Sequence, residues 1–205
     1  MVNVLIFLFL LVVFIIFLFL YVKYAKRISD KKWWETHKFC NFPIRYKGKT
    51  VWVSRSVAVI GFVFCQDENG DWYVLANQRG KGTPDYQGYW NVICGYLDYN
   101  ECGEDAVSRE IHEETGLNVD AEKFELCRVN TLPSSDDRQN VTLGYVTILD
   151  GTIDDHSDFS KKYMEKDEVA DIKWVKISTL YLYEWAFGHF DLINMIYKNK
   201  IDKDA

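Results

Sequence analysis

The chain has 205 residues, of which 48% are hydrophobic, and its formal net charge is −6 at pH 7. A general nucleic-acid-binding surface needs clustered positive charge, so the acidic balance argues against one, and we expect no general nucleic-acid partner. The five cysteines are scattered and form no C-x-x-C pair. This pattern argues against a disulfide framework or a zinc site and is typical of reduced thiols in a cytoplasmic domain.

Residues 1–22 contain no charged side chain. As a helix, this stretch would rise about 33 Å, against about 30 Å for the hydrocarbon core of a bilayer. A cleaved signal peptide would instead need a basic start, a shorter apolar run and a small-residue cleavage site, and none of these is present. The sequence therefore predicts one N-terminal transmembrane helix over 1–22 that anchors the chain.

The segment after this stretch is basic, because residues 23–55 hold ten Lys or Arg and two Asp or Glu. Positive charge next to a span favours the cytoplasmic side of the membrane. We therefore expect a single-pass membrane protein whose folded domain is cytoplasmic. The expected organisation is an anchor over 1–22, a basic juxtamembrane stalk over 23–49 and a folded domain over 50–200.

The folded domain alternates β-branched apolar runs with polar turn segments. Asn69-Gly70 between two such runs is a strong hairpin signal. Strands together with two amphipathic helices indicate a mixed sheet between helical layers, an α/β fold. Strands are expected over 57–65, 72–76, 90–94, 124–132, 141–149 and 170–176, and helices over 103–115 and 190–197.

The most informative stretch is Gly95–Leu117. On a helix, Glu110, Glu113 and Glu114 stand at i, i+3 and i+4, so three carboxylates project from one face and repel one another. A divalent cation would offset this repulsion, because Mg²⁺ prefers oxygen ligands from a few carboxylates. We therefore expect a Mg²⁺ site here, with Mn²⁺ as a possible substitute.

This stretch resembles the Nudix box of the Nudix hydrolases, G-x5-E-x7-R-E-U-x-E-E-x-G-U, in which U is aliphatic. Many members of that family have Pro-Gly-Gly where this chain has Ile93-Cys94-Gly95. Asp98 replaces a common Glu, and Asn100 replaces a common Gly. All fixed positions are nevertheless filled, by Gly95, Glu101, Arg109, Glu110, Ile111, Glu113, Glu114, Gly116 and Leu117.

The resemblance implies a Nudix-type α/β/α sandwich and a pyrophosphohydrolase that cleaves a nucleoside diphosphate linked to another moiety, X. Catalytic roles would fall to Glu110 as the general base, to Arg109, which orients it, and to Glu168, a late carboxylate that could take the base's place. Arg79 resembles a recurrent phosphate-binding arginine. The metal-binding residues implied by the box are Gly95, Glu101, Glu110, Glu113 and Glu114.

The substrate is less well defined by the sequence. Pro133 lies sixteen residues after Leu117, a spacing that resembles a marker of ADP-ribose pyrophosphatases. ADP-ribose or another ADP-linked molecule is therefore the expected small-molecule substrate. Two alternatives stay open: a house-cleaning pyrophosphohydrolase of nucleoside triphosphates, and a non-catalytic, membrane-tethered nucleotide sensor. A homodimer is compatible with the sequence.

Overall fold

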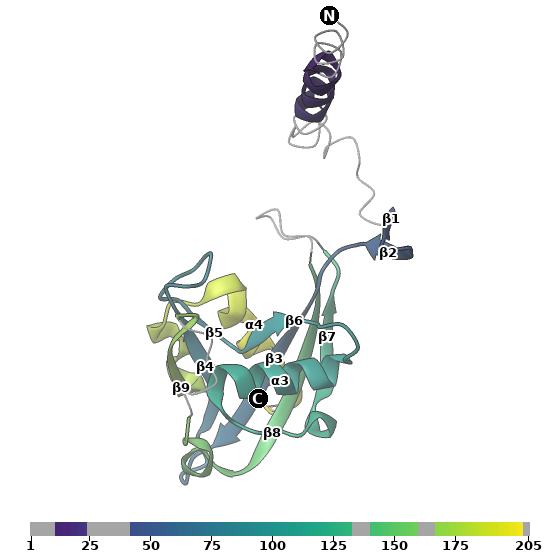
Figure 1. Ribbon diagram of the computed structural model, residues 1–205. Helices are drawn as coiled ribbons and strands as arrows, with labels where there is room; N and C mark the ends of the chain where they lie inside the picture. The colour runs from purple at the N-terminus through teal and green to yellow at the C-terminus, as the bar shows by residue number, and fades with distance from the viewer. Residues whose placement is uncertain (1–10, 24–41, 133–139, 160–166, 203–205) are drawn as a thin grey trace, which may run out of the picture. The chain divides into compact units, whose positions relative to one another are not determined.

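The computed structural model describes residues 11–23, 42–132, 140–159 and 167–202 (Figure 1). The chain divides into two compact units, Met1–Arg55 and Ser56–Ala205. Each unit is described by itself below.

The first unit holds a helical segment over 11–23 and a hairpin of strands β1 (Phe42–Tyr46) and β2 (Lys49–Val53). No helix within the described residues is both long and apolar enough to cross a bilayer. The structure therefore does not support the predicted span over 1–22, whose first ten residues lie outside the described part. No strand was predicted over residues 42–53. The hairpin forms there because Lys47 and Gly48 both take positive φ angles, 46° and 77°, which suit a two-residue turn.

The second unit is built on a seven-stranded sheet. Five strands lie in the order β5-β4-β3-β8-β7, while β6 pairs with β3 and β9 pairs with β4. Only β3 and β8 run parallel, so the predicted mixed sheet is confirmed. The strands are β3 (Val57–Gln66), β4 (Trp72–Arg79), β5 (Trp90–Asn91), β6 (Cys94–Tyr96), β7 (Glu125–Asn130), β8 (Val141–Thr152) and β9 (Val169–Lys176).

The central strand β3 has two different edges. Along one edge it pairs with β8 over almost its whole length. On the other edge it pairs with β4 through residues 64–66 and with β6 through residues 58–60. Between these two pairings Gly61 N donates to Ile93 O at 2.9 Å. The sheet therefore opens between β4 and β6, and residues from both helical layers can approach the opening.

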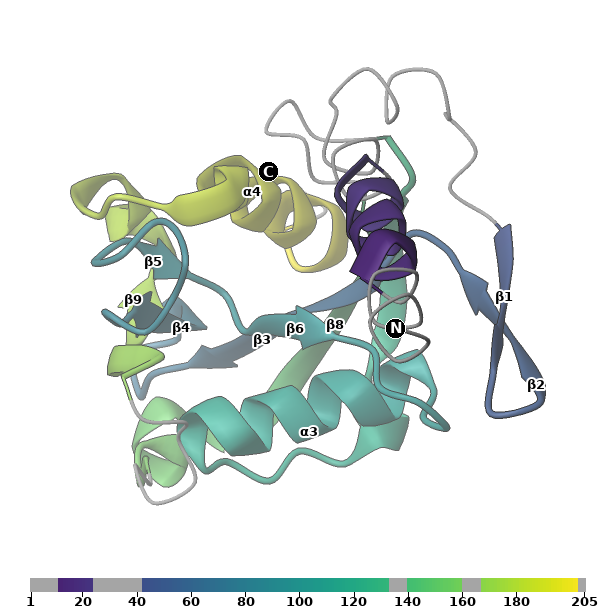
Figure 2. The ribbon, with the colours of Figure 1, turned by 45° about the horizontal axis from the view of Figure 1, so that its top comes forward.

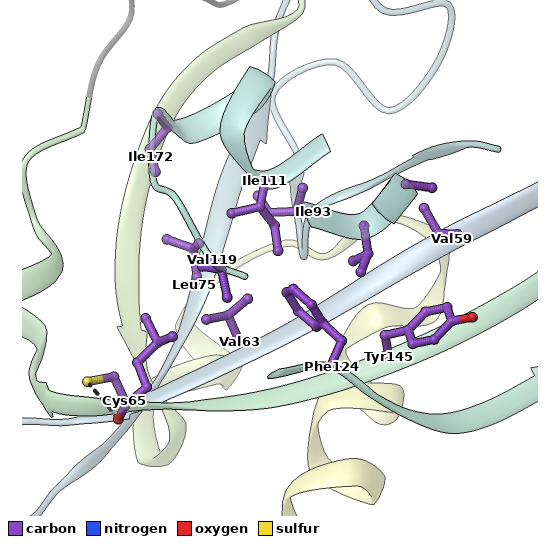
Figure 3. Close-up of a cluster of buried hydrophobic side chains, with 13 residues drawn as sticks. Val59, Val63, Cys65, Leu75, Ile93, Ile111, Val119, Phe124, Tyr145 and Ile172 are labelled. Atoms are coloured by element: carbon purple, nitrogen blue, oxygen red, sulfur yellow. Dashed lines mark hydrogen bonds between the residues drawn. The ribbon is translucent and has the colours of Figure 1, made fainter. Parts of the chain in front are cut away.

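The two longer helices of this unit, α3 (Gly103–Thr115) and α4 (His189–Lys200), cover opposite faces of the sheet (Figure 2). Under α3, the core includes Val59 and Val63 of β3 and Ile111 of α3, which belong to one buried cluster between helix and sheet (Figure 3). A second core under α4 includes Phe62 and Phe64 of the same strand. Short 3₁₀ turns complete the unit: η1 (Ala121–Lys123), η2 (Ile153–His156), η3 (Ile177–Leu182) and η4 (Ala186–Gly188).

The expected strand over 90–94 is two short strands in the structure, β5 and β6. Val92 and Ile93 between them are fully buried. Val92 N donates to His189 Nδ1 at 3.2 Å, while Ile93 O accepts from Gly61 N. Between β5 and β6 the chain stops pairing with β4 and begins pairing with β3. A run of apolar residues does not reveal this change of partner. Pro133 lies outside the described residues.

Candidate active site

Helix α3 presents the candidate catalytic residues. Asp105 in its first turn suits the positive end of the helix dipole, and Gly116 ends the helix with a left-handed φ of 80°. Val107 and Ile111 are buried against β3. With these two side chains fixed in the core, the glutamates of the helix must lie along its other sides.

Arg109 forms hydrogen bonds with the acidic groups around it. Its Nε and Nη2 atoms donate to the two carboxylate oxygens of Glu101 at 3.0 and 2.8 Å. Its Nη1 atom donates to Glu110 Oε1 and to Glu113 Oε2, both at 2.9 Å. Nη2 also donates to the carbonyl oxygen of Tyr96 at 3.0 Å. One guanidinium thus binds three of the four predicted ligand glutamates, one from the loop before the helix and two from the helix itself.

Glu101 lies at the junction of this loop and the helix. Besides its two bonds from Arg109, it accepts a bond from Asp98 N at 2.6 Å. These hydrogen bonds from Arg109 hold the pKa of the Glu101 carboxyl below its usual value. The neighbouring Asn100 takes a φ of 74°, which asparagine tolerates better than most residues. Glu101 therefore holds the loop to the helix.

Glu110 lies against the backbone of Gly95. A Cβ atom added at Gly95 would come within 2.1 Å of the Glu110 carboxylate, so only glycine leaves room for it. Burial raises the pKa of Glu110, and the nearby guanidinium of Arg109 opposes that shift. A raised carboxyl pKa brings this group closer to the range in which a general base works well.

Glu114 is held separately from the other glutamates. Asn77 Nδ2, from β4, donates to Glu114 Oε2 at 2.6 Å. Burial, with the charge of Glu110 as a second cause, raises the pKa of Glu114 well above its usual range. The thiol of Cys94 is nearby, and burial raises its pKa to about 12, which keeps it protonated at neutral pH.

The loop after β4 brings a fourth carboxylate to the site. Gly80 N donates to the backbone oxygen of Glu168 at 2.6 Å, and Gly82 N donates to Asp167 O at 2.8 Å. A side chain at Gly80 would collide with the Asp167 backbone at 2.0 Å. These backbone bonds place Glu168, far away in the sequence, close enough for its charge to influence Glu114.

Arg79, at the end of β4, forms the side of the site near α4. Its Nη2 atom lies 2.7 Å from Asp85 Oδ1, and its Nε atom donates to the Asp85 carbonyl oxygen. The guanidinium also lies 4.8 Å from the centre of the Phe187 ring. A guanidinium has five N–H donors, so these contacts leave Arg79 with donors for a ligand.

Most of these side chains line one cavity of about 980 Å³. Every predicted site residue lines it except Glu101. The cavity is also lined by residues that were not predicted from the sequence, among them Asn77, Arg128 and Thr142. Cys94 also lines the cavity. Its position directly before Gly95, the first residue of the box, could have identified it from the sequence. Asn77, Arg128 and Thr142 lie on strands outside the box, so no local pattern marks them.

The cavity fits a divalent cation by its chemistry. Among the residues that the structure describes, no group of three or more His, Cys, Asp or Glu is arranged to hold a metal ion. Arg109 donates to Glu110 and Glu113, and Asn77 donates to Glu114. The available donors are nevertheless carboxylate and amide oxygens, which Mg²⁺ prefers. The buried oxygen Oδ1 of Asn77 has no hydrogen-bond partner among the described residues.

The model of the NUDIX domain family matches residues 55–195, more than two thirds of the chain. The chain belongs to the Nudix family. The match begins one residue before the second compact unit and includes the box and all the residues described above. The Nudix sandwich and the pyrophosphohydrolase class expected from the sequence are thereby confirmed.

Solved Nudix structures share the fold. A MutT/nudix family protein from Enterococcus faecalis has 20% identity and a TM-score of 0.58, covering 87% of this chain and 72% of its own. The NUDIX domain of Shewanella oneidensis NrtR, solved with ADP ribose, has 19% identity and a TM-score of 0.57, covering 85% of this chain and 97% of its own. A bifunctional NMN adenylyltransferase/ADP ribose pyrophosphatase from Francisella tularensis, complexed with AMP and a Mn ion, has 18% identity and a TM-score of 0.58, covering 87% of this chain and 47% of its own.

One curated relative matches over a shorter stretch. The isopentenyl-diphosphate delta-isomerase of Leifsonia xyli is 38% identical over 58 residues, 28% of this chain. The match spans 31% of the length of that relative. This short match gives no substrate for the Nudix chain, so the substrate needs a separate argument.

Proposed function

We propose that this Nudix enzyme is a Mg²⁺-dependent hydrolase that cleaves the diphosphate of a nucleoside diphosphate linked to a second moiety, X. ADP-ribose or a similar ADP-linked molecule is the proposed substrate. The observation that carries this proposal is that Glu110, Glu114, Glu168 and Arg79 all line one cavity. Carboxylates for a cation and a guanidinium for phosphate are the two requirements of diphosphate binding.

The cation would be held by Glu110, Glu113, Glu114 and the carbonyl oxygen of Gly95, with Mn²⁺ as an alternative to Mg²⁺. When bound, it supplies positive charge that neutralises the diphosphate and makes water more acidic. Glu101 belongs to the same proposal as an outer support, since its bonds to Arg109 keep the loop and the helix together.

Glu110 is the proposed general base. It is positioned by Gly95 on one side and by the Nη1 atom of Arg109, at 2.9 Å, on the other. It takes a proton from the attacking water, and its raised pKa suits that role near neutral pH. Glu168 is the alternative base, because the Gly80 loop places it in the same cavity.

Arg79 is the proposed phosphate-binding residue. Its pairing with Asp85 fixes the guanidinium plane, and its remaining donors can contact phosphate oxygens. The products would be a nucleoside monophosphate and a phosphorylated X. Support for ADP-ribose comes from the proteins named with it among the similar structures, and from Pro133 in the sequence.

A hydrolysis screen of the full chain with Mg²⁺ tests the proposal, using ADP-ribose, dinucleotides, NADH and nucleoside triphosphates. We expect the highest kcat/KM for ADP-ribose or another ADP-linked molecule. A clear preference for nucleoside triphosphates would support the house-cleaning alternative. Tight binding of ADP-ribose without turnover in Mg²⁺ or Mn²⁺ would support the sensor instead.

A second candidate function is the isomerisation of a small diphosphate ester. It is favoured by the local match to the isopentenyl-diphosphate isomerase together with the protonated Cys94 thiol in the cavity. Isopentenyl diphosphate is therefore a further substrate for the screen, with product identity read by NMR. Release of phosphate would assign it to hydrolysis, and a shifted carbon–carbon double bond without release would assign it to isomerisation.

We also propose that residues 1–22 anchor the chain in a membrane and that the catalytic unit is cytoplasmic. The support is the uncharged run followed by basic residues. Membrane fractionation with protease protection of the full chain tests both points, and light scattering in detergent tests a homodimer. Recovery of the whole chain in the soluble fraction would exclude the anchor.

A further inference from the structure

Asn77 occupies an unusual place for a polar side chain. It lies in β4 with neighbours on both sides, Asn91 of β5 and Ile172 of β9. Only 2% of its surface is exposed, and that surface belongs to the lining of the catalytic cavity. Burying an amide group costs free energy unless its donors and acceptors are satisfied.

The nitrogen and the oxygen of the Asn77 amide differ in whether they have a hydrogen-bond partner. Its Nδ2 atom donates to Glu114 Oε2 at 2.6 Å, a short bond to a carboxylate. Its Oδ1 atom has no hydrogen-bond partner within the described residues. Because the side chain is held by a paired strand and by Glu114, this oxygen cannot turn to solvent. It is a buried acceptor without a partner, in a residue that lines the cavity beside a glutamate that the box assigns to the cation.

We propose that Asn77 is a positioning residue of the cation site, with its amide nitrogen orienting Glu114 and its carbonyl oxygen completing the oxygen shell of the bound cation. The inference rests on the proposed function, since it takes the divalent cation from there. Side-chain amide oxygens are accepted ligands of hard cations. Groups that orient a ligand carboxylate affect metal affinity nearly as strongly as the ligands themselves.

Asn91 provides a matched comparison on the neighbouring strand. It is 1% exposed, and its Oδ1 atom also has no partner among the described residues. Its Nδ2 atom, however, donates to Val92 O at 2.8 Å and contacts Cys94 Sγ at 3.6 Å. Asn91 does not line the cavity. The two asparagines therefore share burial and an unsatisfied oxygen, and differ in access to the cation.

The test is Mn²⁺ binding by the full chain, followed by the EPR signal of free Mn²⁺ and by the melting temperature. Asn77→Leu removes both amide functions at similar volume and should weaken Mn²⁺ binding by about 10–100-fold. Asn77→Asp keeps an oxygen and adds a charge. It should lower the melting temperature without metal, and retain Mn²⁺ binding within about threefold of wild type, so that saturating Mn²⁺ restores most of the loss.

Asn91→Leu and Asn91→Asp are the controls. Both should lower the melting temperature equally with and without Mn²⁺, as expected for a purely structural asparagine. The proposal is overturned if Asn77→Leu binds Mn²⁺ like wild type, or if Asn77→Asp loses stability that Mn²⁺ does not restore. A wild type that binds no Mn²⁺ or Mg²⁺ would instead remove the proposed metal-dependent function, and this inference with it.

Discussion

The carboxylate of Glu110 packs so closely on Gly95 that a Cβ atom at Gly95 would come within 2.1 Å of it. Gly95→Ala must therefore displace Glu110 from its place in the cavity. We expect kcat to fall by ~10²-fold, since a catalytic group misplaced by about 1 Å can cost that much. The double variant Gly95→Ala/Glu110→Gln should be no slower than the slower single variant. Multiplying losses would show that Gly95 acts independently of Glu110.

Replacement of Glu110 itself tests its chemical role. Glu110→Gln keeps the shape of the side chain and removes its charge, so kcat should fall by ~10²-fold or more. The melting temperature without metal should stay the same or rise, because one of several neighbouring negative charges is removed. Glu122→Gln, on η1 and outside the cavity, is the control and should leave both unchanged. Normal turnover by Glu110→Gln would mean that another residue is the general base, and Glu168 would be the first to test.

Arg109→Lys tests whether the several N–H donors of the guanidinium group are needed for stability. Its three nitrogens reach three carboxylates and one carbonyl oxygen, whereas an ammonium group cannot span them. We expect Arg109→Lys to cost roughly 2 kcal/mol, a fall of about 4–8 °C in Tm by calorimetry. Arg128→Lys is the matched control, because no carboxylate pairs with Arg128 among the described residues. Equal Tm values for both variants would show that the hydrogen bonds of Arg109 do not stabilise the fold.

Arg128 is expected to bind a part of the substrate away from the cleaved bond. Of the three arginines that line the cavity, Arg79 and Arg109 are paired with carboxylates, while Arg128 is not paired within the described residues. Its strand, β7, lies three strand spacings from Gly95 in β6, about 14 Å. Arg128→Gln should therefore raise KM by ~10-fold and leave kcat nearly unchanged.

The control for Arg128 is Lys198→Gln, an exposed change on α4 outside the cavity, which should leave KM unchanged. Steady-state kinetics on the best substrate of the hydrolysis screen would measure both variants. A fall in kcat at constant KM would move Arg128 from substrate binding into the chemical step.

His189 should make stability depend on pH. It is buried, its Nδ1 atom accepts the bond from Val92 N, and burial lowers its pKa to about 3. The unfolded histidine titrates near pH 6.5, so between those values the unfolded chain binds more protons and stability falls as the pH falls. At pH 5 the loss should be about 2 kcal/mol relative to pH 7. His189→Gln should show a smaller fall in Tm over this range, and an equal fall would assign the acid sensitivity to other groups.

The features predicted from sequence are those set by local spacing. The apolar run of β3 and the i, i+4 pair Val107 and Ile111 determine which sides of those elements are buried, whatever the rest of the chain does. The spacing of the box likewise put Glu110 and Arg109 next to each other on one helix, and both line the cavity. These predictions needed only the periods of a strand and a helix.

Other features depend on partners far away in the sequence. Val92 leaves the sheet to meet His189, 97 positions later, and Glu168 reaches the cavity through backbone bonds to the Gly80 loop. Asn77 looks like an ordinary strand residue until Glu114 of α3 lies beside it. Such contacts carry no periodic signal, so sequence spacing alone gives no access to them.

The parallel pairing of β3 with β8 determines when the site can exist. Val57 pairs with Val141, 84 positions later, and the whole Nudix box lies between them in the chain. Closing so long a loop is entropically costly, and domains dominated by such non-local pairings fold slowly. During synthesis on the ribosome, β3 and α3 emerge well before β8, so the nascent chain carries its glutamates for some time without the sheet that aligns them. Catalytic competence should therefore arise late, at the step that inserts β8 beside β3.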